Sequence, residues 1–107
     1  TGTTATITPG TIKASYLTGF TGAGVATVVV KGYRAGDVII HSRQVKFSVV
    51  AGVPAVLGTP ATIGTDTGAV TTIAFDISTD LRVRVTPPDS TSTKWSCTID
   101  WEFEAVT

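Results

Sequence analysis

The feature of this sequence that most restricts its fold is a strict alternation of apolar and polar residues near the C-terminus. From residue 95 to residue 105 every second residue is apolar, and the residues between them are all polar. The apolar set is Trp95, Cys97, Ile99, Trp101, Phe103 and Ala105. Side chains of a strand point alternately to its two faces, whereas a helix would scatter these rings around its circumference. We therefore predict a long, half-buried strand whose rings face the core.

Two shorter alternations precede this segment. Residues 71–77 and 81–85 each alternate mostly apolar side chains with smaller or polar ones, which is typical of strands buried on one face. Ser78-Thr79-Asp80 between them is short enough for a hairpin turn, and residues 87–93 form a longer loop into the C-terminal strand. We expect residues 70–106 to form a three-stranded antiparallel meander.

The rest of the chain also has the composition of strands. Threonine and valine favour extended backbone, and glycine and proline recur at short intervals. Further strands are expected near residues 5–7, 12–17, 25–31, 38–50 and 55–63, with breaks at Pro54 and Pro60. The apolar pattern changes between His41 and Gln44, which suggests a bulge or a bend there. The chain is therefore predicted to be a single all-β domain over residues 1–107, an antiparallel β-sandwich of jelly-roll-like or related form.

The low charge of the chain suggests that part of its surface is covered by a partner. Charged residues make up 15% of the 107 residues, against about 25% in typical soluble domains, and the mean hydropathy is +0.32. No apolar run approaches the roughly 18 residues of a membrane-spanning helix, so no membrane insertion is expected. Burial between subunits would explain this composition, and an exposed binding face would explain it equally well. We predict a homo-oligomer.

Charge is balanced overall but not along the chain. The net charge is zero, so no basic field favours nucleic acid as a partner. Residues 1–65 hold five basic residues and one acid, Asp37, whereas residues 66–107 hold three basic and seven acidic residues. Two explanations are open: cross-strand ion pairs within one fold, or complementary faces that meet between subunits.

One histidine and one cysteine limit the chemistry of the chain. Neighbours on a strand point to opposite faces, so His41 and Ser42 do not form part of a catalytic triad. We expect His41 at the surface or an interface; a small hydrolase would need it buried beside a carboxylate and a serine from elsewhere. Cys97 lies on the apolar face of its strand and is expected in the core. No catalytic residue, metal site or cofactor is predicted.

Three acids, Asp100, Glu102 and Glu104, form a row on the polar face of the C-terminal strand. Neighbours in this row are roughly 7 Å apart, too far for a pair that shares one proton. A calcium site would need carbonyl groups from other loops. Because Arg82 and Arg84 lie on the polar face of the preceding strand, we expect a ladder of exposed ion pairs between the two strands.

Two loops carry aromatic residues and are the candidate binding sites. Phe20 lies between glycines in residues 18–24, and Tyr33 precedes Arg34 in residues 31–34. Exposed rings stack on sugar faces and arginine donates hydrogen bonds, so Phe20, Tyr33 and Arg34 suit carbohydrate or protein recognition. The alternative is that both rings fold back and close the ends of the sandwich. Residues 19–24 lack the lysine and the following helix of a nucleotide-binding loop.

Several short motifs of the second half form a recognisable pattern. They are Ala55-Val56-Leu57-Gly58-Thr59-Pro60, Asp66-Thr67-Gly68-Ala69, Leu81-Arg82-Val83-Arg84-Val85-Thr86, Thr93-Lys94-Trp95-Ser96-Cys97 and Glu102-Phe103-Glu104-Ala105-Val106. Through them, residues 55–106 resemble a domain found toward the C-termini of phage tail fibres and tailspikes. Pro87-Pro88 replaces the glycine expected after Val85-Thr86, so the loop there departs from the family pattern.

The resemblance implies a virion structural protein, commonly trimeric, that takes part in fibre assembly or in attachment to a host surface glycan or protein. We predict a non-enzymatic tail domain, one protomer of a homotrimer, in the virion and extracellular to the host during attachment. The alternative is a carbohydrate-binding module of a bacterial or phage enzyme, which would bind glycans as a monomer through Phe20 or Tyr33. Because the chain starts at Thr1, contains no Met and has no signal-like segment, we expect a processed product or a piece of a longer protein.

Overall fold

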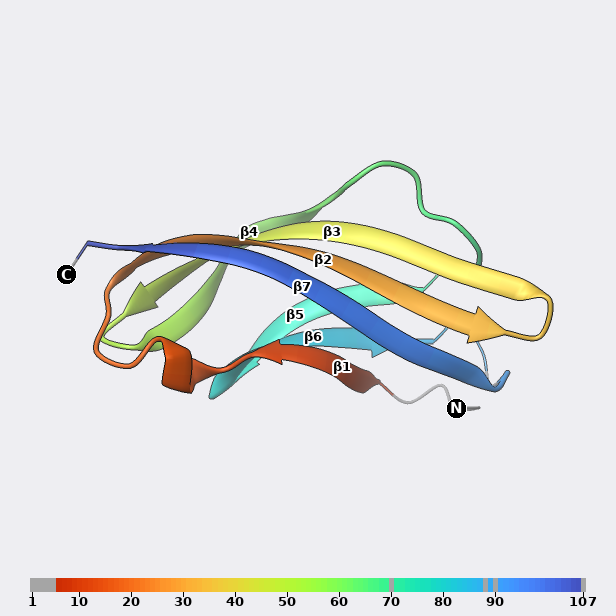
Figure 1. The fold of residues 1–107 in the computed structure, drawn as a ribbon, viewed down its shortest axis with the longest axis horizontal. Coiled ribbons are helices and arrows are strands. Elements are labelled where there is room, and N and C mark those ends of the chain that lie inside the picture. The colour runs from red at the N-terminus through yellow and green to blue at the C-terminus, as the bar shows by residue number, and fades with distance from the viewer. Residues whose placement is uncertain (1–5, 70, 88, 90, 107) are drawn as a thin grey trace.

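The computed structural model describes residues 6–69, 71–87, 89 and 91–106, which form strands and one short 3₁₀ turn (Figure 1). The strands are β1 (Ile7–Ile12), β2 (Gly22–Arg34), β3 (Asp37–Val50), β4 (Val53–Thr62), β5 (Thr72–Ser78), β6 (Asp80–Thr86) and β7 (Thr93–Ala105). The turn η1 (Ala14–Tyr16) lies between β1 and β2. Ala5, in the first expected strand, Val70, at the start of the expected meander, and Pro88, in the loop before the last strand, lie outside the described residues.

The strands form two antiparallel sheets that pack face to face. One sheet has the order β1-β6-β5, and the other has the order β4-β3-β2-β7. Within the second sheet, β2 and β3 form a long hairpin with a continuous register from Gly22–Val49 to Arg34–Asp37. Figure 1 shows these long strands running along the length of the molecule, with β1, β5 and β6 beneath them. The predicted all-β architecture, compatible with an antiparallel sandwich, is confirmed.

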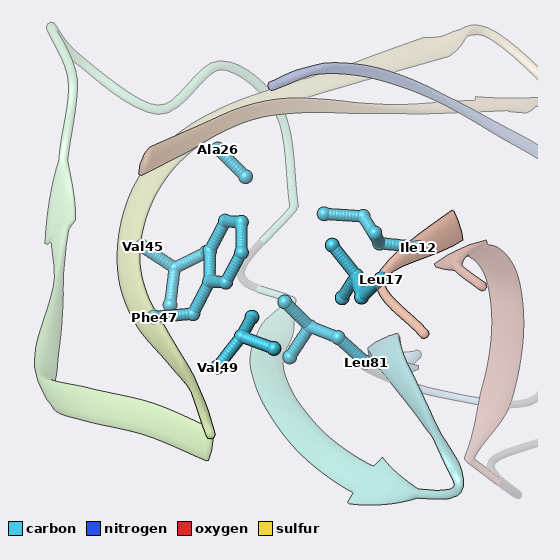
Figure 2. Close-up of a cluster of buried hydrophobic side chains, with 7 residues drawn as sticks. All are labelled: Ile12, Leu17, Ala26, Val45, Phe47, Val49 and Leu81. Carbon is cyan, nitrogen blue, oxygen red and sulfur yellow. The ribbon is translucent and has the colours of Figure 1, made fainter. Parts of the chain in front are cut away.

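The core lies between the two sheets and contains two groups of buried side chains. The larger group is Ile12, Leu17, Ala26, Val45, Phe47, Val49 and Leu81, and Figure 2 shows these side chains directed into the space between the sheets. The second group is Val28, Val30, Val83 and Val85. The larger group takes alternate residues of β3, and the second group takes alternate residues of β2 from one sheet and of β6 from the other, as the twofold period of a strand requires.

β7 has the orientation predicted from its alternation. Trp101 packs against Phe47 of the larger core group, with 6.4 Å between the ring centroids, and Trp95 packs against the second group. Both tryptophans therefore lie on the core side of one extended strand, as expected. Their side chains are only half-buried because β7 is an edge strand of its sheet.

The meander predicted for residues 70–106 is wrong in its last step. β5 and β6 pair as a hairpin that turns between Ser78 and Asp80, as expected. β7, however, pairs along its whole length with β2 in the other sheet. β2 and β7 have 13 residues each, whereas β6 has 7. Pairing with β2 thus satisfies more backbone groups of β7 than pairing with β6 would.

Residues 12–17, predicted as a strand, instead end β1 and form η1. The carboxylate of Asp80 accepts a hydrogen bond from the backbone N–H of Ala14 at 2.9 Å. The N–H of Leu17 donates to the carbonyl of Ala14, also at 2.9 Å. This tight turn brings Leu17 inward, where it is 1% exposed; a strand continued past Ile12 would carry it beyond the core.

The breaks predicted at Pro54 and Pro60 are absent, because β4 runs through both prolines. β4 is an edge strand paired only with β3, and an edge tolerates a residue without an N–H. The bulge predicted in β3 near His41 lies in β4 instead. The register passes from Lys46–Leu57 to Gln44–Ala61, and Gly58 in the inserted stretch has a φ of 66°, which glycine adopts readily.

Candidate interaction surface

The outer face of the four-stranded sheet carries an apolar patch near the β2–β3 hairpin. Tyr33, Val38 and Ile40 lie there with 70%, 43% and 39% of their surface exposed. Tyr33 of β2 stands opposite Val38 of β3. Ile39, between the two β3 residues, is buried in the core, so this part of β3 is apolar on both faces. We call Tyr33, Val38 and Ile40 the hairpin patch.

Two lysines border the hairpin patch. Lys94 of β7 is opposite Tyr33, and Lys31 of β2 stands between Ile40 and Ser96 in the next outward row. These residues line an open groove of about 300 Å³. An aromatic ring beside ammonium donors and aliphatic side chains is suited to bind a sugar ring or an extended protein segment.

A second open groove, of about 530 Å³, lies toward the other end of the same face. Val25 of β2 stands there between Lys46 of β3 and Glu102 of β7. Ala23, two residues earlier on β2, is opposite Glu104. The small side chains of β2 are thus recessed between longer charged ones, and the β7 side of this groove is acidic.

The ladder of ion pairs predicted between Arg82, Arg84 and the acids of β7 is wrong, because the two strands belong to different sheets. Arg82 donates hydrogen bonds of 2.7 and 2.8 Å to Asp76 of β5, and Arg84 lies 3.7 Å from the same carboxylate. The hydrogen bonds from Arg82 hold the pKa of Asp76 below its usual value. Within the described ranges, the three acids of β7 make no ion pair with a side chain.

Two ion pairs do join the basic first part of the chain to its acidic second part. Arg43 binds both carboxylate oxygens of Asp66 at 2.7 and 2.9 Å, and these bonds lower the pKa of Asp66. Arg34 binds Asp89 at 2.9 Å. Pairing within the fold therefore explains part of the uneven charge. In the part of the chain that the structure describes, it leaves the lysines and the acids of the outer face unpaired.

The three residues predicted to bind a ligand do not form one site. Tyr33 is exposed in the hairpin patch, but the side chain of Arg34 is only 12% exposed and is held by Asp89. Phe20 lies at the other end of β2, 46% exposed and edge-on to Phe103 at 6.5 Å. Tyr33 thus stands as the candidate. Val38 and Ile40 were not singled out from sequence, although the Val38-Ile39-Ile40 run, apolar at every position, was the signal for them.

The surface or interface position predicted for His41 is wrong, because its side chain is buried with 2% exposed. Its Nδ1 lies 3.5 Å from Oδ2 of Asp66, and neither ring nitrogen has a hydrogen-bond partner among the described residues. Ser42 follows on the opposite face of β3. The carboxylate that a hydrolase would need is therefore near His41, but no described serine hydrogen-bonds to its ring.

Cys97 lies on the core side of β7, as predicted, and burial raises the pKa of its thiol. Among the described residues, no three histidine, cysteine or acidic side chains are grouped so that they could hold a metal ion. The same residues include no helix with the length and apolar character needed to cross a membrane.

Comparison with protein-family models, with curated proteins and with solved structures gives no significant match to this chain. Three surface features of the described residues could contact a partner. They are the hairpin patch with its lysines, the groove beside Glu102 and Glu104, and the edge of the four-stranded sheet at β7.

Proposed function

We propose that this chain is a non-enzymatic structural domain of a phage tail, which assembles with copies of itself and attaches to a host surface. The observation that supports the proposal is the apolar character of the outer sheet face. Six large apolar side chains on it are each at least 39% exposed: Tyr33, Val38, Ile40, Val50, Val53 and Leu57. Small monomeric proteins rarely leave so many apolar side chains on one face without a partner.

The finer parts of this proposal come from the resemblance of residues 55–106 to phage tail fibre domains. They are a jelly-roll-related topology, a trimeric assembly, and a place in the virion tail that is exposed outside the host. The low charge of the chain gives independent support for self-association, since burial between subunits covers apolar surface. The receptor would be a host glycan or protein that contacts the hairpin patch, where Tyr33 lies beside Lys94.

Light scattering at micromolar concentration tests the assembly role. A mass well above the 11.0 kDa of one chain is expected, and a monomer at every concentration would contradict the proposal. Binding to bacterial cells and to their purified surface polysaccharides tests attachment. Tyr33→Ala should weaken binding roughly tenfold, as removal of a central aromatic contact does. Thr27→Ala, on the same face of the same strand, serves as the control and should bind normally.

A carbohydrate-binding module is the second candidate, and the 70% exposure of Tyr33 favours it. Such a module would work as a monomer, because one exposed ring platform is sufficient to stack on a sugar. The same two measurements separate the candidates. A monomer that binds soluble glycans through Tyr33 would support the module, whereas an oligomer that binds cells supports the tail domain.

A further inference from the structure

The edge of the four-stranded sheet formed by β7 is open. β7 pairs with β2 on one side, and no strand in the described ranges pairs with its other side. In Figure 1, β7 lies along one border of this sheet for most of the length of the molecule. The opposite edge strand, β4, contains Pro54, Pro60 and a bulge. Such features protect an edge against pairing with another chain, and β7 has neither a proline nor a break in its register with β2.

The backbone groups on this open edge belong to the odd-numbered residues from Trp95 to Phe103. The N–H of Val106 donates to the carbonyl of Thr21 at 2.7 Å, which sets the phase of the β2–β7 ladder. Even-numbered residues of β7 therefore hydrogen-bond to β2, and the odd-numbered residues from Trp95 to Phe103 direct their N–H and C=O groups away from it. Their side chains lie on the core side and, from Trp95 to Phe103, are half-buried. A strand added here would cover these side chains further.

We propose that β7 pairs with β7 of a second copy of this chain, antiparallel, about a twofold axis at Ile99. This inference rests on the proposed assembly role and names the partner and the contact, and it specifies a twofold dimer in place of the trimer that the resemblance implies. In this register residues 95–103 of the two β7 strands lie opposite each other, and about ten backbone hydrogen bonds form across the axis. The two four-stranded sheets become one continuous sheet with both cores on the same side.

The charges of β7 match this register. Lys94 stands opposite Glu104 of the second copy, and the twofold axis repeats this pair at the other end. Between the two ends, Ser96 faces Glu102 and Thr98 faces Asp100, so no two like charges are directly opposite. Opposite charges on facing strands are favourable, whereas like charges are not. Moving the axis to Asp100 would remove both lysine–glutamate pairs and place the two Asp100 carboxylates face to face.

Charge reversal with sedimentation equilibrium tests this contact. The wild type should show a monomer–dimer equilibrium. Lys94→Glu and Glu104→Lys should each weaken dimerisation roughly tenfold or more, because each replaces two attractions by two repulsions. The double variant should recover the wild-type affinity, and an equimolar mixture of the two single variants should form heterodimers. Lys46→Glu makes the same charge change on β3, away from the edge, and should leave dimerisation unchanged.

Cysteine cross-linking tests the register on a Cys97→Ala background. Thr98 and Asp100 of the second copy form a pair without hydrogen bonds across the axis, with Cα atoms about 4.5 Å apart, which suits a disulfide. A mixture of Thr98→Cys and Asp100→Cys chains should therefore cross-link rapidly. Thr98→Cys chains alone should cross-link far more slowly. Circular dichroism melting confirms that each variant is folded.

The outcomes separate this inference from the proposed function. A dimer that is indifferent to the charge of Lys94 and Glu104, or rapid cross-linking of Thr98→Cys with itself, would overturn the twofold contact at Ile99. A trimer would also overturn it and would leave the proposed assembly role standing. A protein that is monomeric at all concentrations would contradict both the twofold contact and the proposed assembly role.

Discussion

The imidazole of His41 lies 3.5 Å from a carboxylate oxygen of Asp66, and both oxygens of that carboxylate are hydrogen-bonded by Arg43. The ring is buried, and neither of its nitrogens has a hydrogen-bond partner in the described part of the chain. A buried polar group without a partner keeps its cost of desolvation and gains little in return. We therefore expect that burial of the His41 ring does not stabilise the folded domain.

The first prediction follows from this arrangement. His41→Leu should leave the free energy of unfolding unchanged or raise it, because an apolar side chain of similar size removes two unsatisfied nitrogens. Urea unfolding at neutral pH measures the effect. Val45→Ala, four residues along the same face of β3, is the comparison and should destabilise the domain by leaving a cavity. If His41→Leu lowered the free energy of unfolding as much as Val45→Ala does, the histidine would have to make a stabilising contact, and the prediction would be wrong.

The second prediction concerns acid stability and the pair formed by Arg34 and Asp89. Hydrogen bonds from Arg34 and then from Thr91 lower the pKa of Asp89 from 3.8 to about 2. A carboxylate whose pKa is lowered on folding stabilises the protein above its unfolded pKa, and this contribution is lost as the pH falls through the folded value. Asp89→Asn should therefore destabilise the domain modestly at pH 6, and its difference from the wild type should shrink as the pH falls from 3.8 to about 2.

Urea midpoints measured across this pH range check the second prediction. Asp37→Asn is a suitable control, since Asp37 makes no ion pair among the described residues. Its difference from the wild type should not follow the titration of Asp89. A difference for Asp89→Asn that kept its pH 6 value down to about pH 2 would mean that protonation of this carboxyl does not release the pair.

The third prediction uses the close approach of β2 to its neighbours at Gly24. A Cβ atom at this position would overlap the ring of Phe47 and lie 2.7 Å from the backbone oxygen of Glu102. Gly24→Ala should destabilise the domain by roughly 1–3 kcal/mol, because overpacking outweighs the gain in chain stiffness. Ala23→Ser, on the exposed face of the same strand, should change stability by less than about 0.5 kcal/mol. Equal melting temperatures for the two variants would contradict the packing at Gly24.

The sequence predicted features that depend on a single strand, such as which face each side chain occupies. It did not predict which strands pair with each other. The alternation from Trp95 to Ala105 correctly assigned faces, because the direction of a side chain depends only on its own strand. It could not show that β7 pairs with β2, because β6 offers the same alternation and lies nearer in sequence. The choice depends on the length of the partner strand and on the path of the loop after Thr86, and both are properties of the folded chain.

The candidate surface was foreseen only in part, for the same reason. Tyr33 could be singled out from its own neighbours, but its grouping with Lys94 required the β2–β7 pairing. The burial of His41 likewise depends on residues 63–69, where Asp66 lies and where Thr67 pairs with Ile40 of β3. A contact between segments so far apart in the chain leaves no local pattern in the sequence.

The fourth prediction tests the orientation of β7. Trp101 packs against Phe47 at 6.4 Å between centroids and stacks on Tyr16 at the same separation, so Trp101→Ala removes contacts on two sides. The loss of unfolding free energy should be about 3 kcal/mol, toward the lower end for such truncations because the ring is half-buried. Glu102→Gln, the next residue, faces the solvent side of the strand and should change stability by less than about 0.5 kcal/mol. If the two variants lost stability equally, the assignment of Trp101 to the core face and of Glu102 to the solvent face would be wrong. The register proposed for pairing at the open edge of β7 would then also be wrong, because it depends on that assignment.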